Sequence, residues 1–237
     1  MSPGTPLPYG YSWTQAPRPA GRVSTSRREL YQIGGAFAIL TLDIVLLLAG
    51  TGFFVGTNST SVDYNVSLTV VVVAAAAAFT GFVAHELAHK IVAQRRGYWA
   101  EFRWSIVGLA VSVFTAIIGF LWAAPGATVV SGMSDSKEWG HTALAGPSIN
   151  LVFGGMFYAA SLATWYAGNP LFGWLLILAF LNCWFAAFNL VPWGILDGAK
   201  VFHWNRGAWA GSMALAAGLA GISWLAVFIY GSPLLHF

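Results

Sequence analysis

Residues 66–94 read VSLTVVVVAAAAAFTGFVAHELAHKIVAQ. No charged side chain interrupts this stretch before Glu86, so about 20 uncharged residues precede the first acid. A helix of that length, at about 1.5 Å per residue, matches the roughly 30 Å hydrocarbon core of a bilayer. The stretch therefore predicts a membrane-spanning helix whose last turns are polar.

The composition of the whole chain agrees with this prediction. Of its 237 residues, 57% are hydrophobic and 8% are charged, whereas about a quarter of an ordinary soluble domain is charged. These values exclude a water-soluble globule, and they exclude a disordered chain because disorder requires low hydrophobicity. A net charge of +3 is too small to indicate nucleic-acid binding. The single cysteine, Cys183, excludes an intrachain disulfide and a cysteine zinc cluster.

Several other apolar stretches are long enough to enter a membrane. Together with residues 66–94, the apolar stretches are 30–56, 105–124, 141–167, 170–190 and 207–230. We expect an all-α polytopic membrane protein with about five to six transmembrane helices. Residues 1–26 are rich in proline and predict a flexible cytoplasmic tail. Residues 27–237 predict a single membrane-embedded domain with its core at 66–205.

Basic residues flank the first two apolar stretches. Arg27 and Arg28 precede the first, and Arg95 and Arg96 follow the second. Because Lys and Arg accumulate in cytoplasmic loops, we expect the N-terminus and residues 94–104 to lie in the cytoplasm. Apolar and polar side chains partly alternate over residues 95–103, which predicts a strand or hairpin near the interface.

The polar end of the opening stretch contains His85-Glu86-Leu87-Ala88-His89. Residues four apart share a helix face, so His85 and His89 can direct ring nitrogens at one zinc ion while Glu86 reaches a water molecule. Ionisable groups at membrane depth are costly unless they face a cavity, a metal or one another, and they therefore indicate function. The alternative is a polar cluster that only hydrogen-bonds helices together.

A hydrolytic zinc site needs one more protein ligand than two histidines. Asp197 is the candidate, because Pro192 and Gly194 before it break the fifth helix and can turn a carboxylate inward. Such broken backbone is tolerated at membrane depth only where it lines protein or a water-filled cavity. For Asp197 alone, an interfacial acid beside Lys200 is the alternative.

Three blocks of sequence follow one another between residues 85 and 198. They are His85-Glu86-x-x-His89 with Ala93 and Gly97, Ala145-Gly146-Pro147-x-x-Asn150, and Asn189-x-x-Pro192-x-x-x-Leu196-Asp197-Gly198. In content and order they resemble the catalytic core of the site-2 protease family of intramembrane zinc metalloproteases.

The resemblance implies one Zn²⁺ per chain, with the ligands His85, His89 and Asp197 and with Glu86 as the general base. It implies that Asn189 lies near the metal and steadies the substrate or the oxyanion. It also implies support for the site from the neighbouring helices, through the residues Gly146, Pro147, Asn150 and Pro192. The implied activity is hydrolysis of transmembrane protein substrates within the lipid bilayer, here of a prokaryotic plasma membrane.

The candidate ligands constrain the topology. His85 and His89 lie toward the cytoplasmic end of their helix and Asp197 lies at the C-terminal end of its own, so the two helices must run parallel. If residues 105–124 crossed the membrane fully, the fifth helix would run the wrong way. We therefore predict that residues 97–131 stay on the cytoplasmic side as a re-entrant or strand-containing segment. We expect an edge strand there to accept an unwound substrate by β-addition.

Other polar residues fit ordinary structural roles. Asp43 predicts a helix–helix hydrogen bond, and Glu101 predicts a side chain that faces solvent. His141 and His203 are rival ligands, although interfacial histidines usually meet water and headgroups. The sequence also allows a catalytically inactive metal-binding scaffold or a membrane transporter. It leaves open the oligomeric state and the identity of the substrate.

Overall fold

The computed structural model describes residues 23–50, 67–121 and 125–231. Its helices are α1 (Arg27–Gly50), α2 (Leu68–Ala78), the π-helix η1 (Phe79–Val83), α3 (Ala84–Arg95), α4 (Ile106–Ile117), α5 (Ser136–Tyr166), α6 (Leu171–Asn189), α7 (Asp197–Trp204), α8 (Arg206–Ala226) and the π-helix η2 (Val227–Gly231). Its two strands are β1 (Trp99–Trp104) and β2 (Gly126–Ser131). The predicted helical class with one strand-containing segment is confirmed.

Within the described ranges, five helical stretches are long and apolar enough to cross a membrane. They are Arg27–Leu48, Leu68–Arg95, Ser136–Tyr166, Leu171–Asn189 and Arg206–Tyr230. Many large apolar side chains on these stretches face outward, among them Val72, Met156 and Ile222. An outward apolar surface on long helices suits contact with lipid. The chain is a membrane protein.

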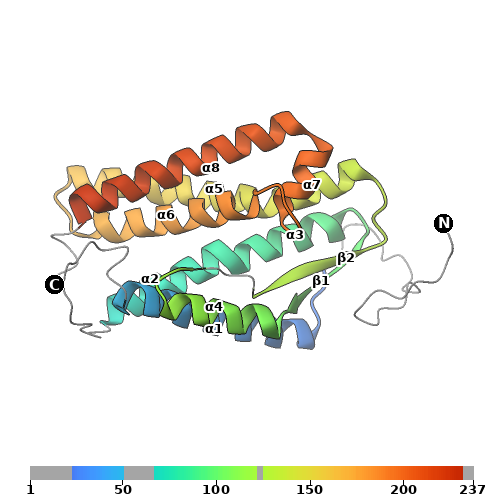
Figure 1. Cartoon of the computed structure of the whole chain (residues 1–237), viewed down its shortest axis with the longest axis horizontal. Helices are drawn as coiled ribbons and strands as arrows, with labels where there is room; N and C mark the ends of the chain where they lie inside the picture. The colour runs from blue at the N-terminus through green and yellow to red at the C-terminus, as the bar shows by residue number, and fades with distance from the viewer. Residues whose placement is uncertain (1–22, 51–66, 122–124, 232–237) are drawn as a thin grey trace.

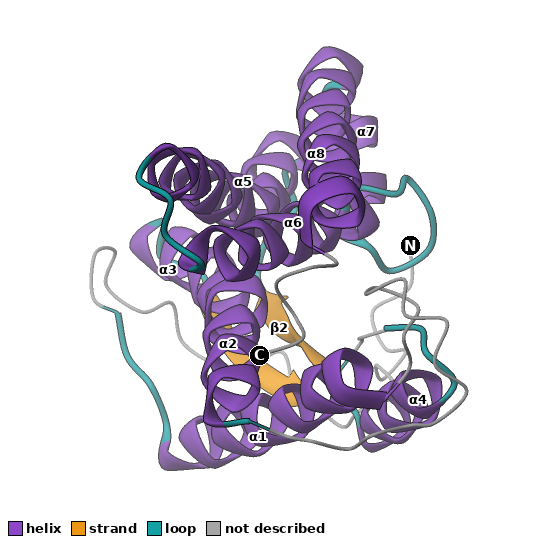
Figure 2. Ribbon diagram, turned by 90° about the vertical axis from the view of Figure 1, so that its left-hand side faces the viewer, coloured by secondary structure: helices purple, strands orange, loops and turns teal. Residues whose placement is uncertain are grey.

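The helices form two layers (Figure 1). One layer contains α5, α6 and α8, and the other contains α1, α4 and the continuous helix from α2 to α3. Both α3 and α6 run toward the end of the molecule at which α7 and the strands lie, so the predicted parallel course is confirmed. Figure 2 looks along the helices and shows the strands above α1, between α2 and α4.

A π-helix interrupts the second span just before the two histidines. Asn150 of α5 donates its side-chain amide to the carbonyl of Gly81 in η1, at 3.1 Å. Asn182 of α6 donates to the hydroxyl of the neighbouring Thr80, at 3.0 Å. A π-turn breaks the regular helical hydrogen-bond pattern, so amides from two adjacent helices can hold it. These contacts set the rotation of α3 relative to α5 and α6.

Strands β1 and β2 pair antiparallel, with Trp99 opposite Ser131 and Trp104 opposite Gly126. The chain therefore leaves the sheet after β1 and re-enters it at the same end to form β2. The intervening α4 has 12 residues, which span only about 18 Å. The predicted strand-containing segment is confirmed, and α4 is too short to cross a membrane by itself. The strand expected within 95–103 pairs with 126–131 rather than forming a local hairpin, because α4 is inserted between the two strands.

Side chains from α1 and α3 cover the outer edge of β1. The N–H of Phe102 donates to Oε1 of Glu29, at 2.9 Å, and Nε2 of Gln94 donates to the carbonyl of Ala100, at 2.7 Å. Glu29 also pairs with the buried Lys90, at 2.5 Å. The backbone groups of Phe102 and Ala100 thus point away from β2 and are not open to another strand.

The end of the proline-rich segment contacts the same network. The N–H of Ser24 donates to Oε1 of Gln94, at 2.8 Å, and Lys90 donates to the hydroxyl of Thr25, at 2.8 Å. These two contacts fasten residues 24 and 25 to α3. The predicted tail before residue 23 lies outside the described residues.

Two buried carboxylates test the sequence-based expectations, and one of them differs. Glu101 is buried rather than solvent-facing, because Arg103 lies two positions along β1 on the same face and forms an ion pair with it. Asp43 is buried in α1 and faces α4. The nearby polar side chain is Ser112 of α4, so the contact expected for Asp43 does link two helices.

A turn at residues 190–196 separates α6 from α7. Gly194 adopts φ +64°, a conformation that side chains disfavour. Asp197 therefore begins α7 instead of ending the fifth helix, which corrects the sequence-based placement. A Cβ on Gly198 would overlap the carbonyl of Leu190, so only glycine allows α7 to fold back this closely on the end of α6. This close return turns Asp197 inward.

Candidate metal centre

His85, His89 and Asp197 meet in the structure. Oδ2 of Asp197 lies 3.2 Å from Nε2 of His85 and 2.9 Å from Nε2 of His89, and the two Nε2 atoms are 3.0 Å apart. All three residues are buried. Two histidines on one face of α3 thus converge with a carboxylate from the start of α7. Two nitrogens and one carboxylate oxygen, with room for water, form a donor set of catalytic zinc sites.

Hydrogen bonding at His89 indicates that a cation fits this cluster. Its Nδ1 lies 2.7 Å from the carbonyl of Thr142, so Nδ1 carries the proton of that hydrogen bond. In the neutral ring, Nε2 then directs a lone pair at the lone pairs of the Asp197 carboxylate, at 2.9 Å. Two hydrogen-bond acceptors that face each other repel, so a proton or a cation must lie between them. Fixing one ring nitrogen so that the other can bind metal is also typical of zinc-site histidines.

Lys200 approaches the cluster from the side opposite the histidines. Its Nζ lies 3.2 Å from Oδ1 of Asp197, whereas Oδ2 faces the imidazoles. Asp197 belongs to α7, outside the five candidate spans. Burial raises the pKa of its carboxyl, but the charge at His89, the hydrogen bonds from both histidines and the charge of Lys200 bring that pKa well below its usual range. The carboxyl is therefore ionised and able to serve as a ligand.

Gly146 gives the two histidines their space. A Cβ at this position of α5 would overlap Nε2 of His89 and Nε2 of His85. The backbone of α5 therefore lies directly against the face of α3 that carries the two histidines. The next residue of α5, Pro147, is also buried. The close packing of α5 on α3 depends on the absence of a side chain at residue 146.

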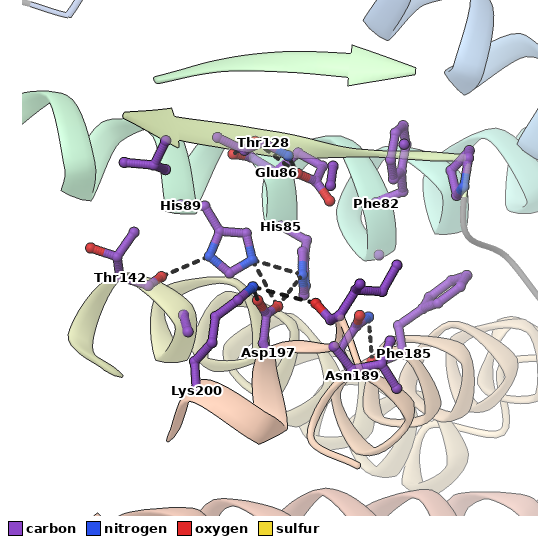
Figure 3. Close-up of a pocket in the computed structure, with 18 of the residues that line it drawn as sticks. Phe82, His85, Glu86, His89, Thr128, Thr142, Phe185, Asn189, Asp197 and Lys200 are labelled. Carbon is purple, nitrogen blue, oxygen red and sulfur yellow. Dashed lines mark hydrogen bonds and ion pairs between the residues drawn. The ribbon is translucent and has the colours of Figure 1, made fainter. Parts of the chain in front are cut away.

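Glu86 lies beside the ligands and contacts strand β2. Its Oε2 accepts from the N–H of Thr128 at 2.7 Å and lies 2.7 Å from the hydroxyl of the same residue. Figure 3 shows Glu86 and Thr128 meeting on the β2 side of the histidines, with Asp197 and Lys200 on the opposite side. A pocket is lined by the ligand cluster, Glu86 and Thr128 together. The carboxylate is thus at the site but outside the ligand cluster.

The remaining predicted site residues lie at different places around the ligand cluster. Asn189 lines the pocket, and its Nδ2 donates to the carbonyl of Phe185 at 3.0 Å. An amide nitrogen has two hydrogens, so one remains available. Asn150 contacts η1 rather than the ligand cluster, and Pro192 is exposed in the turn before α7.

Sequence reasoning missed Thr128 and Thr142, whose contacts with Glu86 and His89 come from β2 and α5. Nothing in their local sequence marks them, because both contacts depend on tertiary packing. The rival histidines lie apart from the cluster. His141 packs against the ring of Trp204, with centroids 4.4 Å apart, and His203 is exposed. Among the described residues, the ligand group comprises His85, His89 and Asp197.

A protein of Methanocaldococcus jannaschii, named "Putative zinc metalloprotease", is 34% identical to this chain over 149 residues. The alignment covers 62% of this chain and 77% of that protein. The chain belongs to the site-2 protease family. No family model and no solved structure matches it. The relative's name supports metalloprotease activity and zinc for this site-2 protease family member, in agreement with the donor set that the structure assembles.

Proposed function

We propose that this site-2 protease family member is an intramembrane zinc endopeptidase that cuts peptide bonds within or near transmembrane segments of membrane proteins. The position of the ligand cluster supports this proposal. His85 and His89 lie in the second span, and the pocket beside them is also lined by residues from α1, α5 and α6. A site enclosed by helices that face lipid meets membrane-embedded chains more readily than soluble ones.

The residues of the pocket can divide the work of peptide hydrolysis. A zinc ion held by His85, His89 and Asp197 would supply Lewis acidity and lower the pKa of a water molecule. Glu86 accepts the proton of the attacking water and returns it to the departing amine. The amide hydrogen of Asn189 that is not bonded to Phe185 donates to the developing oxyanion.

Strand β2 offers the edge on which an extended substrate can pair. Thr128 lies opposite Phe102, and Val130 lies opposite Ala100. In an antiparallel ladder, opposite residues share the same orientation, so the backbone groups of Thr128 and Val130 also point away from the partner strand. Both residues and Gly126 line the pocket. A helix that unwinds at its cleavage site would add here as a third strand, whereas β1 (Trp99–Trp104) is the covered strand.

The orientation and location follow from charge and from the relative. Arg27, Arg28, Arg95 and Arg96 all lie at the end of the molecule that contains β1 and β2. Because basic residues favour the cytoplasmic side, this end faces the cytoplasm in the proposal, together with the N-terminus. The M. jannaschii relative supports a prokaryotic plasma membrane as the location.

The proposal is tested by zinc content and by cleavage of a transmembrane substrate in detergent, for the wild type and Glu86→Gln. We expect both proteins to hold about one zinc per chain and only the wild type to cleave, because Glu86 is beside the ligands without being one. Zinc in both proteins with no cleavage by the wild type of several transmembrane substrates would favour the inactive scaffold. Absence of zinc from protein purified without chelators would contradict the metal site itself.

A further inference from the structure

We propose that Thr128 is a positioning residue for the reaction, and that its hydroxyl holds Glu86 in place while a substrate strand occupies the edge of β2. The inference rests on the proposed function. It adds a role for β2 beyond substrate pairing, because the same residue contacts both the strand edge and the general base.

Thr128 makes three contacts with Glu86. Its N–H and its hydroxyl both lie 2.7 Å from Oε2, and the hydroxyl also lies 3.0 Å from the backbone carbonyl of Glu86. The glutamate side chain is buried and has three rotatable bonds. Both donors meet the same oxygen, which leaves Oε1 as the oxygen for proton transfer.

The backbone donor of Thr128 has two competing uses. Its N–H points away from β1, on the edge of β2 that lines the pocket. A substrate strand that pairs with this edge needs that N–H for a carbonyl of its own backbone. Substrate binding therefore withdraws the N–H from Glu86 at the stage when the base must be correctly placed.

The hydroxyl has no such competition. A side chain on a strand projects from the face of the sheet, whereas ladder hydrogen bonds form in the plane of the sheet. The hydroxyl of Thr128 can thus stay on Oε2 after the N–H has turned to the substrate. Removal of the hydroxyl should leave substrate binding intact and let Glu86 move away from the reacting water, which affects kcat rather than KM.

The first test compares Thr128→Val with Thr128→Ser in zinc-loaded protein on a transmembrane substrate that the wild type cleaves. Valine keeps the shape and the N–H but lacks the hydroxyl. We expect Thr128→Val to lower kcat about tenfold, the scale of one lost hydrogen bond to a charged group, with KM within about twofold of wild type. Thr128→Ser should recover at least half of the lost kcat, because it restores the donor.

Thr164→Val is the matched control. The hydroxyl of Thr164 bonds to backbone carbonyls of Ala160 and Ser161 in its own helix, α5, and its loss should leave kcat unchanged. A kcat for Thr128→Val equal to that of wild type would overturn the proposal. A change confined to KM would overturn it too, since that result assigns Thr128 to substrate binding alone.

A second measurement does not depend on activity. We expect Thr128→Val to lower the melting temperature of zinc-loaded wild type about twice as much as it lowers that of Glu86→Ala, because the alanine variant retains only the backbone acceptor. Equal shifts in the two backgrounds would show that Thr128 does not act on the carboxylate. If this coupling is present while wild type cleaves no transmembrane substrate, the proposed function fails and the Thr128–Glu86 contact stands.

Discussion

One carboxylate oxygen organises the candidate centre at the scale of single residues. Oδ2 of Asp197 lies within 3.2 Å of Nε2 of both His85 and His89. Each of these atoms is buried at a place where an uncompensated charge would be costly. The carbonyl of Thr142 holds the proton of His89 on Nδ1, and Lys200 balances the charge of Asp197. Gly146 leaves space for the two imidazoles. The site thus depends as much on its supporting residues as on its ligands.

Gly146→Ala should weaken zinc binding. The new Cβ would overlap Nε2 of both histidines, so α5 or the imidazoles must shift, and we expect an affinity about tenfold or more below wild type, with a parallel loss of cleavage. Competition with a chelator measures the affinity. Gly155→Ala is the control, because a Cβ at Gly155 of the same helix meets nothing within 4 Å. Equal zinc affinities for the two variants would contradict the packing argument.

The two strands have different environments at the scale of elements. Glu29 and Gln94 bond to the outer edge of β1, whereas the outer edge of β2 lines the pocket. An edge strand is a template for another chain unless it is covered. The covering of β1 therefore directs strand addition to β2, next to Glu86.

Val130→Pro should reduce cleavage without removing the metal. The N–H of Val130 points to the outer edge of β2, so proline there leaves the ladder to β1 in place but removes a donor that a substrate strand would use. We expect kcat/KM to fall about tenfold or more with zinc content unchanged. Val130→Ala keeps the N–H and should stay close to wild type. Normal cleavage by the proline variant would mean that substrates do not pair with β2.

The course of the chain through the two layers decides which residues can meet at the scale of the whole molecule. The α2–η1–α3 span and α6 run in the same direction, and α7 returns Asp197 to the end of α3 (Figure 1). The β1–α4–β2 segment begins and ends at that same end. An even number of crossings between α3 and α6 would separate the ligands by the thickness of a membrane. Only α5 has the length to cross between them, because α4 is a helix of 12 residues.

This topology predicts the accessibility of three exposed positions in a Cys183→Ala background. Arg95→Cys and Lys137→Cys flank the β1–α4–β2 segment and should react with a membrane-impermeant maleimide from one side. Asn169→Cys, between α5 and α6, should react from the other side. Labelling of intact cells and of inverted vesicles distinguishes the sides. Reaction of positions 95 and 137 from opposite sides would show that α4 completes a crossing.

The sequence alone determined the membrane class, the spans, the two histidines and Glu86. Apolar length and the four-residue helical spacing are local properties, so residues 66–94 suffice to reveal them. It also identified Asp197, although it placed this residue at the end of a helix rather than at the start of α7. Orientation, substrate and the roles of the site residues remain proposals that these variants test.

Only the tertiary structure decided how β1 finds its partner beyond α4, why Glu101 is buried, and that Thr128 and Thr142 contact Glu86 and His89. Each of these features joins residues that are far apart in the chain or depends on which face of a strand is covered. Local propensity holds no information on such contacts, because their free energy arises from the packing of whole elements.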